Sequence, residues 1–309
     1  MDTSTDTTSQ VSTTTTRDTS VRTVAGVFPS TPFHWVGDGF RVATYFPSHA
    51  IPAERVSPFL LMDYGPARTV APQAQGRRGV GWHPHRGFET VTLAWEGSVA
   101  HRDSAGHKDV IGPGDAQWMT AASGILHEEY LETEFLRRGG VFHMMQLWVN
   151  LPAKHKMAPP AYQAIPGAKI PTVTLAEEAG TVRVVSGEYD GARGPARTFT
   201  PITMLDVNLR EAKGLRVPLP ASYNALAIVT AGSVRVDGRV VKAGELVLFA
   251  NDGERFELRA DADAHLLVLA GEPIREPIVQ YGPFVMNTRE EIVRAVEDFE
   301  AGRFGPIPE

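Results

Sequence analysis

The strongest constraint on the fold is a pattern of short apolar runs that begins at Val21 and continues along the chain. The runs are rich in Val, Thr, Leu and Phe, and glycine, proline and Asp-Gly pairs interrupt them, which is typical of antiparallel β proteins. Clear strand candidates are ETVTLAWEG (89–97) and VFHMMQLWVNLP (141–152). Asp237-Gly238, between two alternating segments, predicts a two-residue β-hairpin. We therefore expect an all-β protein.

A proline-rich stretch divides the pattern into two halves. It holds four prolines after the strand candidate that ends at residue 152: Pro159, Pro160, Pro166 and Pro171. Since 309 residues can build two medium domains, each with its own core, we expect two β domains over residues 21–155 and 156–309. Residues 1–20 are almost entirely Thr, Ser and Asp, so nothing offsets the entropy of ordering them, and we expect a disordered tail.

One helix is expected at the end of the chain, over residues 289–301. Thr288 followed three residues later by Glu291 forms a capping-box pattern at its start. Three apolar residues then fall on one helical face: Ile292, Val296 and Phe299. Gly302 ends the pattern. The apolar face requires a packing partner, which we expect to be a sheet.

Composition excludes several classes of protein. The formal net charge of -6 leaves no basic surplus to neutralise phosphates, which argues against direct nucleic-acid binding. No apolar run approaches the roughly 18 residues that cross a membrane, and the N-terminus lacks the apolar segment of a secretory signal, so we expect a cytoplasmic protein. The absence of cysteine excludes disulfides, thiolate metal sites and cysteine nucleophiles. Any metal must be bound by nitrogen and oxygen.

Two short motifs carry the chemistry. In GWHPHRGFET, His83 and His85 are two residues apart, so in a strand both imidazoles face one side with Cα atoms roughly 6.5 to 7 Å apart. Pro84 removes one backbone donor, which favours an edge or the start of a strand. In ASGILHEEYLE, His127 and Glu129 repeat the same spacing. These two could instead lie on a solvent-exposed face beside other acidic residues.

If the two segments meet inside a small barrel, three neutral imidazoles and one carboxylate converge on one divalent ion and leave one or two coordination sites free. Such ligands suit Fe(II), Mn, Co, Ni, Cu and Zn.

Four segments resemble the pirin family of the cupin superfamily: HPHRGFETVT, GPGDAQWMTAASGILHEE, MQLWVNLP and VQYGPFVMNT. The resemblance runs from about Val21 to the C-terminus. It implies two tandem jelly-roll (cupin) β-barrel domains, with one metal ion, most often iron, in the first domain. The family's ligands fall here on His83, His85, His127 and Glu129.

Other residues are rivals or accessories. Cupins in general take their carboxylate ligand from the first motif, and Glu89 occupies roughly that place; we favour Glu129, because Gly87 can introduce a bulge that turns Glu89 away. His101 and His107 flank a hairpin tip and are expected at the surface. His143, in an apolar run, is expected in the core or a pocket wall. The second domain contains one histidine after residue 155, His265, and cannot form the same centre.

The resemblance implies a function. Some pirins resemble quercetin 2,3-dioxygenases, so we expect a metal-dependent dioxygenase whose substrates are a flavonol-like aromatic molecule and dioxygen, with Glu129 as the catalytic base. Six residues of the motifs offer an apolar lining for such a substrate: Phe88, Trp118, Met119, Met144, Met145 and Trp148. The alternative is a non-enzymatic, iron-dependent regulator that binds a protein partner. A third possibility is a structural ion in a filled pocket.

Overall fold

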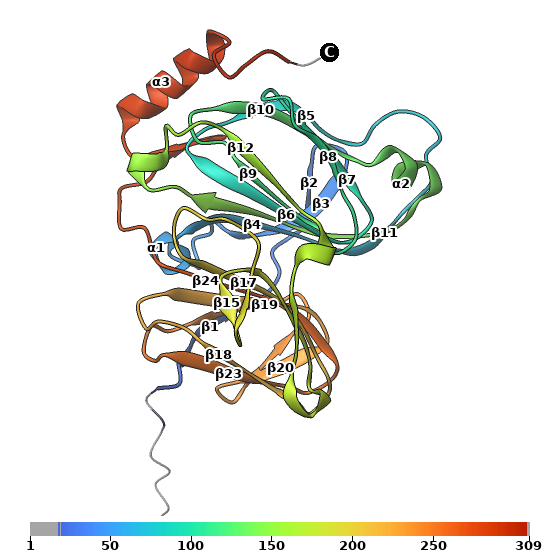
Figure 1. Cartoon of the computed structure of the whole chain (residues 1–309), viewed down its shortest axis with the longest axis vertical. Helices are drawn as coiled ribbons and strands as arrows, with labels where there is room; N and C mark the ends of the chain where they lie inside the picture. The colour runs from blue at the N-terminus through green and yellow to red at the C-terminus, as the bar shows by residue number, and fades with distance from the viewer. Residues whose placement is uncertain (1–17, 19, 308–309) are drawn as a thin grey trace, which may run out of the picture.

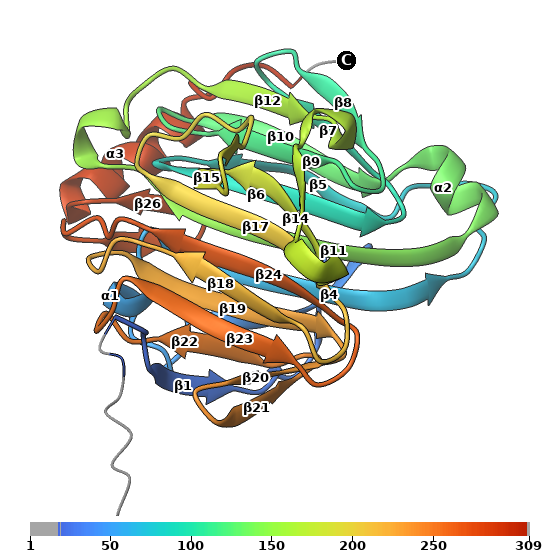
Figure 2. The ribbon, with the colours of Figure 1, turned by 60° about the horizontal axis from the view of Figure 1, so that its bottom comes forward.

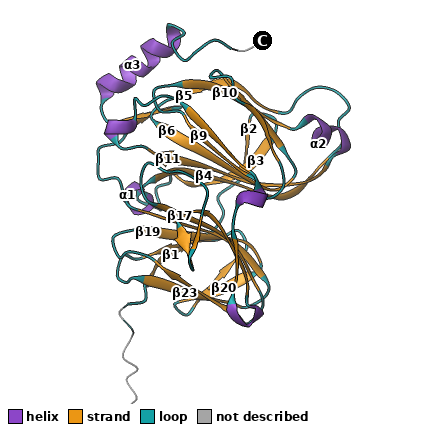
Figure 3. Cartoon of the chain, in the orientation of Figure 1, coloured by secondary structure: helices purple, strands orange, loops and turns teal. Residues whose placement is uncertain are grey.

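The computed structural model describes residue 18 and residues 20–307, and it shows two β-barrels stacked one above the other (Figure 1). Strands dominate both barrels, and helices are few and short apart from the last (Figure 3). The predicted disordered tail of residues 1–20 lies outside the described residues except for Asp18 and Ser20, which both hydrogen-bond Arg255. No helix in the described residues combines the length and apolar character of a membrane span.

Two antiparallel sheets form the first barrel. The larger sheet has the strand order β12-β9-β6-β11-β4-β3-β2, and the smaller has the order β5-β10-β7-β8. Their strands are β2 (His34–Val36), β3 (Phe40–Phe46), β4 (Phe59–Val70), β5 (Gly79–His85), β6 (Phe88–Glu96), β7 (Val99–Asp103), β8 (Lys108–Ile111), β9 (Ala116–Thr120), β10 (Ile125–Leu131), β11 (Gly140–Asn150) and β12 (Ala161–Ile165). Two short helices, α1 (Ala53–Val56) and α2 (Thr133–Arg138), connect strands, and the 3-10 helix η1 (Ala153–His155) follows β11.

The second barrel repeats this plan with the sheet orders β1-β22-β19-β24-β17-β14-β13 and β18-β23-β20-β21. Its strands are β1 (Val24–Phe28), β13 (Thr172–Thr174), β14 (Gly180–Ser186), β17 (Ile202–Leu209), β18 (Gly214–Pro218), β19 (Asn224–Ala231), β20 (Ser233–Val236), β21 (Arg239–Lys242), β22 (Leu246–Phe249), β23 (Arg255–Ala260) and β24 (Ala264–Gly271). The hairpin β15 (Glu188–Tyr189) and β16 (Ala192–Arg193) and the 3-10 helices η2 (Gly167–Lys169) and η3 (Ala176–Glu178) complete it. The predicted hairpin is confirmed: Asp237 and Gly238 join β20 to β21 with φ of 48° and 74°.

The two ends of the chain cross between the barrels. Strand β1 pairs with β22 of the second barrel, whereas the hairpin β25 (Val279–Tyr281) and β26 (Phe284–Met286) and the helix α3 (Arg289–Glu300) lie against the first (Figure 1). Lys156 Nζ fastens this C-terminal segment by donating to the carbonyls of Gly87 at 2.7 Å and Val285 at 2.9 Å. The predicted division after residue 155 places β1 in the first domain and α3 in the second. In the structure β1 pairs with the second barrel, and the C-terminal segment with α3 lies against the first.

Helix α3 begins with the predicted capping box. The backbone N–H of Glu291 donates to Thr288 Oγ1 at 3.2 Å, and the Glu291 carboxylate accepts from the backbone N–H of Thr288 at 3.0 Å. The helix ends at Glu300, one residue before the predicted end. Ile292 is buried on the β25–β26 hairpin, and the Phe299 ring contacts Phe284.

The larger sheets of the two barrels pack face to face and share an apolar core (Figure 2). Val91, Leu93 and Met145 contribute from the first barrel, and Leu226 and Leu267 from the second. Each barrel also has its own interior cluster. The expectation of two tandem jelly-roll barrels with a C-terminal helix is confirmed.

Candidate metal centre

Three histidines converge inside the first barrel. Strands β5 and β10 are antiparallel neighbours, and their register sets His127 opposite His83 and Ile125 opposite His85. Because residues i and i+2 share a strand face, this register directs the three imidazoles to one side. Their ring centroids lie 4.2 Å (His83–His127), 4.7 Å (His85–His127) and 4.8 Å (His83–His85) apart.

The donor set fits a divalent ion. Burial and the neighbouring imidazole of His83 hold the pKa values of His85 and His127 well below the ordinary range, so both rings are neutral and keep a lone pair. Both ring nitrogens of His127 and Nδ1 of His85 are buried and have no hydrogen-bond partner among the described residues. His83 Nδ1 donates to the Gly81 carbonyl at 2.8 Å, which leaves Nε2 free to bind.

Glu129 lies beside this cluster. A β-bulge after His127 shifts the register, and Glu129 then pairs with Val80 on β5 and His101 on β7. Possible ligand atoms lie within 4.8 Å of one another in two groups that share His127: His83, His85 and His127, and His101, His127 and Glu129. The four residues proposed as ligands are therefore brought together through His127, and their assignment as ligands stays a prediction.

Two neutral donors orient the Glu129 carboxylate. Thr92 Oγ1 and Gln146 Nε2 each lie 3.3 Å from one of its oxygens, and the single Thr92 hydroxyl hydrogen is shared with Gln146 Oε1, which lies 2.9 Å from Thr92 Oγ1. Both donors stand on the larger sheet, so the sheet opposite the histidines fixes the carboxylate.

Glu89, the rival carboxylate, lies on the other face of β6. It shares the strand face of Val91 and Leu93, which pack in the core between the barrels. Thr120 Oγ1 donates to Glu89 Oε1 at 2.7 Å, and burial raises the pKa of Glu89 to about 7. Glu89 joins neither group of possible ligands among the described residues.

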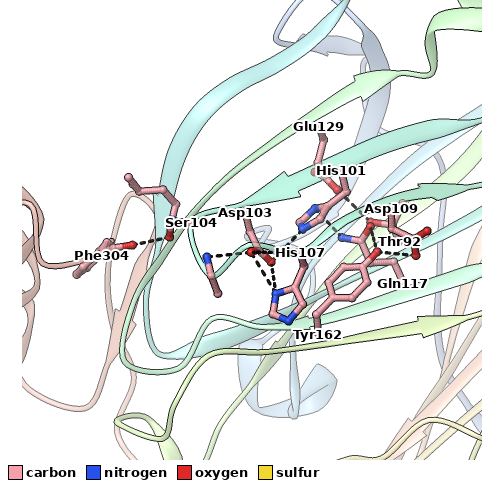
Figure 4. A network of polar contacts seen from close by, with 12 residues as sticks. Thr92, His101, Asp103, Ser104, His107, Asp109, Gln117, Glu129, Tyr162 and Phe304 are labelled. Carbon is pink, nitrogen blue, oxygen red and sulfur yellow. Dashed lines mark hydrogen bonds and ion pairs between the residues drawn. The ribbon is translucent and has the colours of Figure 1, made fainter. Parts of the chain in front are cut away.

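His101 corrects the sequence interpretation. Its side chain is fully buried rather than at the surface, with Gln117 Nε2 donating to Nδ1 at 3.1 Å and Nε2 donating to Asp103 at 3.3 Å (Figure 4). Since both nitrogens are engaged, His101 supports the centre instead of offering a lone pair. Asp103 also binds His107 at 2.9 Å, and Tyr162 stacks on both rings. His107 is half-buried.

The alternation of buried and half-buried residues along β7 could have revealed that His101 is buried, because His101 shares a strand face with the buried Val99.

His143 is buried as expected, but it faces the boundary between the barrels. Its Nε2 lies 3.1 Å from the Tyr64 hydroxyl, and burial lowers its pKa to about 4.

A cavity of about 240 Å³ adjoins the cluster. Its polar lining is His83, His85, Glu129, Asp63, Thr92 and Gln146, and the remainder is apolar: Val36, Phe40, Val42, Val80, Val99, Met144, Trp148 and Pro283. Two of the six predicted lining residues, Met144 and Trp148, line it. Trp118 and Met145 lie in the core between the barrels instead.

The two-barrel fold with histidines inside one barrel defines a bicupin with a candidate metal centre. The family profile described as "Pirin" matches residues 39–149, and the profile described as "Pirin C-terminal cupin domain" matches residues 204–305. The chain belongs to the pirin family.

Relatives cover almost all of the chain. A Pseudomonas aeruginosa protein provisionally named a quercetin 2,3-dioxygenase is 50% identical over 285 residues, which are 92% of this chain and 99% of the relative. The crystal structure of quercetin 2,3-dioxygenase from Acinetobacter baumannii matches with a TM-score of 0.89 and 44% identity, and covers 93% of this chain and 100% of that one. Human pirin is 37% identical over 260 residues, 82% of this chain and 84% of the relative.

Proposed function

We propose that this pirin is a metal-dependent dioxygenase that oxidises a flavonol-like substrate with dioxygen in the first barrel. His83, His85, His127 and Glu129 would bind one divalent ion, with Fe(II) as the first candidate. The observation that carries the proposal is the convergence of three imidazoles and one carboxylate at the wall of a largely apolar cavity.

The charge of the site favours an anionic chelating substrate. Three neutral histidines and one carboxylate leave a divalent ion with a net charge of about +1, which attracts an enolate or a catecholate. When bound, the ion would supply the Lewis-acid and redox chemistry of the reaction. Glu129 accepts the proton of the substrate hydroxyl, while Thr92 and Gln146 hold its carboxylate in place.

The cavity selects for a compact, flat molecule. Its volume of about 240 Å³ is below the roughly 300 Å³ at which pockets for drug-sized ligands begin. The Trp148 side chain and the aliphatic residues of β2 and β3 offer apolar surface to an aromatic ring and exclude water from the carboxylate.

The test begins with protein purified without an affinity-column metal. Metal content is measured first, and oxygen consumption then follows with a panel that runs from flavonols to smaller catechols. We expect one ion per chain and oxygen uptake with at least one chelating substrate. The proposal fails if the Fe(II)-loaded protein consumes neither flavonol nor oxygen while the Acinetobacter baumannii enzyme, run in parallel, consumes both. Partner capture that depends on Fe(II) or Fe(III), without turnover, would support the regulatory alternative.

A further inference from the structure

A row of polar side chains crosses the floor of the cavity. Paired residues on neighbouring strands of the larger sheet run from β3 through β4, β11 and β6 to β9: Thr44, Asp63, Gln146, Thr92 and Gln117. Directly paired residues point to the same side of a sheet, so the row faces the barrel interior together. Asp63, Gln146 and Thr92 line the cavity.

Three members of this row serve the candidate metal centre. Thr92 and Gln146 hold Glu129, and Gln117 holds His101. Asp63 has no such role. Among the described residues its one hydrogen-bond donor is Thr44, which reaches Oδ1, so Oδ2 has no partner.

Asp63 is a costly residue at this place. Only 9% of its surface is exposed, and burial raises its pKa, although the Thr44 hydroxyl and, more weakly, the charge of His34 oppose the shift. Asp63 lines the cavity, and Oδ2 is not among the fully buried atoms of the described residues that lack a partner, so a donor inside the cavity can reach it. The side chain is therefore suited to a donor that the chain itself does not provide.

The spacing of the row gives the distance between Asp63 and Thr92 along the cavity floor. Asp63 stands two strands away from Thr92, and neighbouring strands are about 4.8 Å apart, so their Cα atoms are separated by about 10 Å. Gln146 lies between them: it contacts Glu129 and pairs directly with Asp63, so Asp63 lies on the side of Gln146 away from Thr92. A flat molecule chelated near Glu129 can extend along the floor to Asp63.

We propose that Asp63 accepts a hydrogen bond from a phenolic hydroxyl at the end of the substrate remote from the chelating group, and so selects polyhydroxylated aromatic substrates. This inference rests on the proposed function, because it takes the ligand to be a flat phenol held at the histidine cluster. Asp63 touches the substrate without taking part in binding the ion.

Two flavonols separate the effect of Asp63 from chelation. Quercetin and 3-hydroxyflavone share the 3-hydroxy-4-oxo group that chelates, but 3-hydroxyflavone lacks all other hydroxyls. Their Kd values are measured by absorbance titration of the Fe(II)-loaded protein without oxygen. The wild type is expected to bind quercetin at least about tenfold more tightly, since a hydrogen bond to a charged acceptor contributes that much.

Asp63→Ala is expected to remove most of this preference and to leave the Kd of 3-hydroxyflavone within about twofold of wild type. Asp63→Asn keeps the side-chain volume and should weaken the preference even if the alanine variant folds poorly. The control is Asp261→Asn, which removes a carboxylate paired with Arg235 in the second barrel and should change neither Kd. Metal content should equal that of wild type in all variants.

The results discriminate between this inference and the proposed function. An unchanged quercetin preference in both Asp63 variants, equal weakening of both flavonols, or no preference in the wild type overturns the role of Asp63. Binding of both flavonols by the wild type without oxygen uptake in air overturns the dioxygenase proposal and leaves the role of Asp63 intact. Loss of preference together with a raised KM and a nearly unchanged kcat for quercetin supports both.

Discussion

The two barrels have the same architecture and opposite interiors. In each, a row of paired residues crosses five neighbouring strands of the larger sheet and faces inward. In the first barrel the row is polar, and in the second it is aliphatic: Val184, Leu205, Val268, Ala227 and Val247. All five aliphatic residues are fully buried and belong to the interior core of the second barrel.

The polarity of the inward row decides whether a barrel interior mainly stabilises the fold or can bind a ligand. Each buried Val or Leu of the second row contributes roughly 1.5–3 kcal/mol. The polar row of the first barrel gives up that contribution, and its hydrogen bonds to Glu129 and His101 offset part of the cost. The alternation of the strands therefore determines the barrel, and the polarity of one inward row determines whether that barrel can hold a ligand.

The largest expected effect comes from removing one imidazole from the first barrel. His127→Ala should lower metal affinity at least about 100-fold and abolish turnover, because too few ligands remain. The matched control is His265→Ala in the second barrel, where the imidazole bonds Asp206 at 2.6 Å and belongs to neither group of possible metal ligands among the described residues. Metal content by mass spectrometry distinguishes them; equal metal loss in both variants would contradict the contrast between the barrels.

Glu89 gives the next largest effect, on stability. Its pKa of about 7 lies above the ordinary 4.5, so the folded state binds the extra proton between these pH values. The stabilisation is fully present below pH 4.5 and is lost as the pH rises through 7, a change on the order of 3 kcal/mol. Glu89→Gln should flatten the dependence of the unfolding free energy on pH, measured in urea from pH 4.5 to 8.

The same variant tests which carboxylate binds the ion. Glu89→Gln should keep wild-type metal content, whereas Glu129→Gln should reduce it. Of these two carboxylates, only Glu129 has an oxygen close enough to His127 to share a metal ion with it. The reverse result would restore Glu89 as the fourth ligand.

Sequence patterns predicted the strands, the Asp237-Gly238 hairpin and the capped helix, because each depends on local spacing. They also brought out His83, His85, His127 and Glu129, since two i, i+2 pairs are visible along the chain. Strand β1 joins the second barrel and the C-terminal segment packs on the first, and both arrangements depend on contacts between residues far apart in the sequence. Local sequence patterns do not encode such contacts.

The supporting residues of the site were harder to predict for the same reason. His101 precedes a glycine-containing turn, a pattern that predicts a surface residue, although its side chain is fully buried. Asp63 stands inside an apolar run, and the role proposed for it depends on its pairing with Gln146 on the neighbouring strand. The preference for Glu129 over Glu89 rests on a possible bulge at Gly87, but Gly87, with a φ of 89°, lies in the turn between β5 and β6, and no bulge is found at Glu89.

Adding a polar group to the second barrel should sharpen the comparison. Val268→Thr keeps the side-chain shape but buries a hydroxyl in an aliphatic row, which should lower the unfolding free energy by about 2 kcal/mol. Val110→Thr, on the half-exposed strand β8, is the control and should stay within about 0.5 kcal/mol of wild type. Urea denaturation measures both, and a neutral Val268→Thr would mean that the second interior tolerates polarity as the first does.

The smallest effect is expected from making the first row more like the second. Thr92→Val removes the hydroxyl that contacts Glu129 Oε1 and Gln146 Oε1, and it should reduce metal affinity and kcat/KM about tenfold, as loss of one support for a ligand does. Thr90→Val is a matched control on the same strand and the same face, because Thr90 Oγ1 is buried and has no hydrogen-bond partner among the described residues. Thr90→Val should leave both quantities unchanged and should not destabilise the protein. Equal losses in the two variants would show that hydroxyl burial, rather than the bond to Glu129, accounts for the effect.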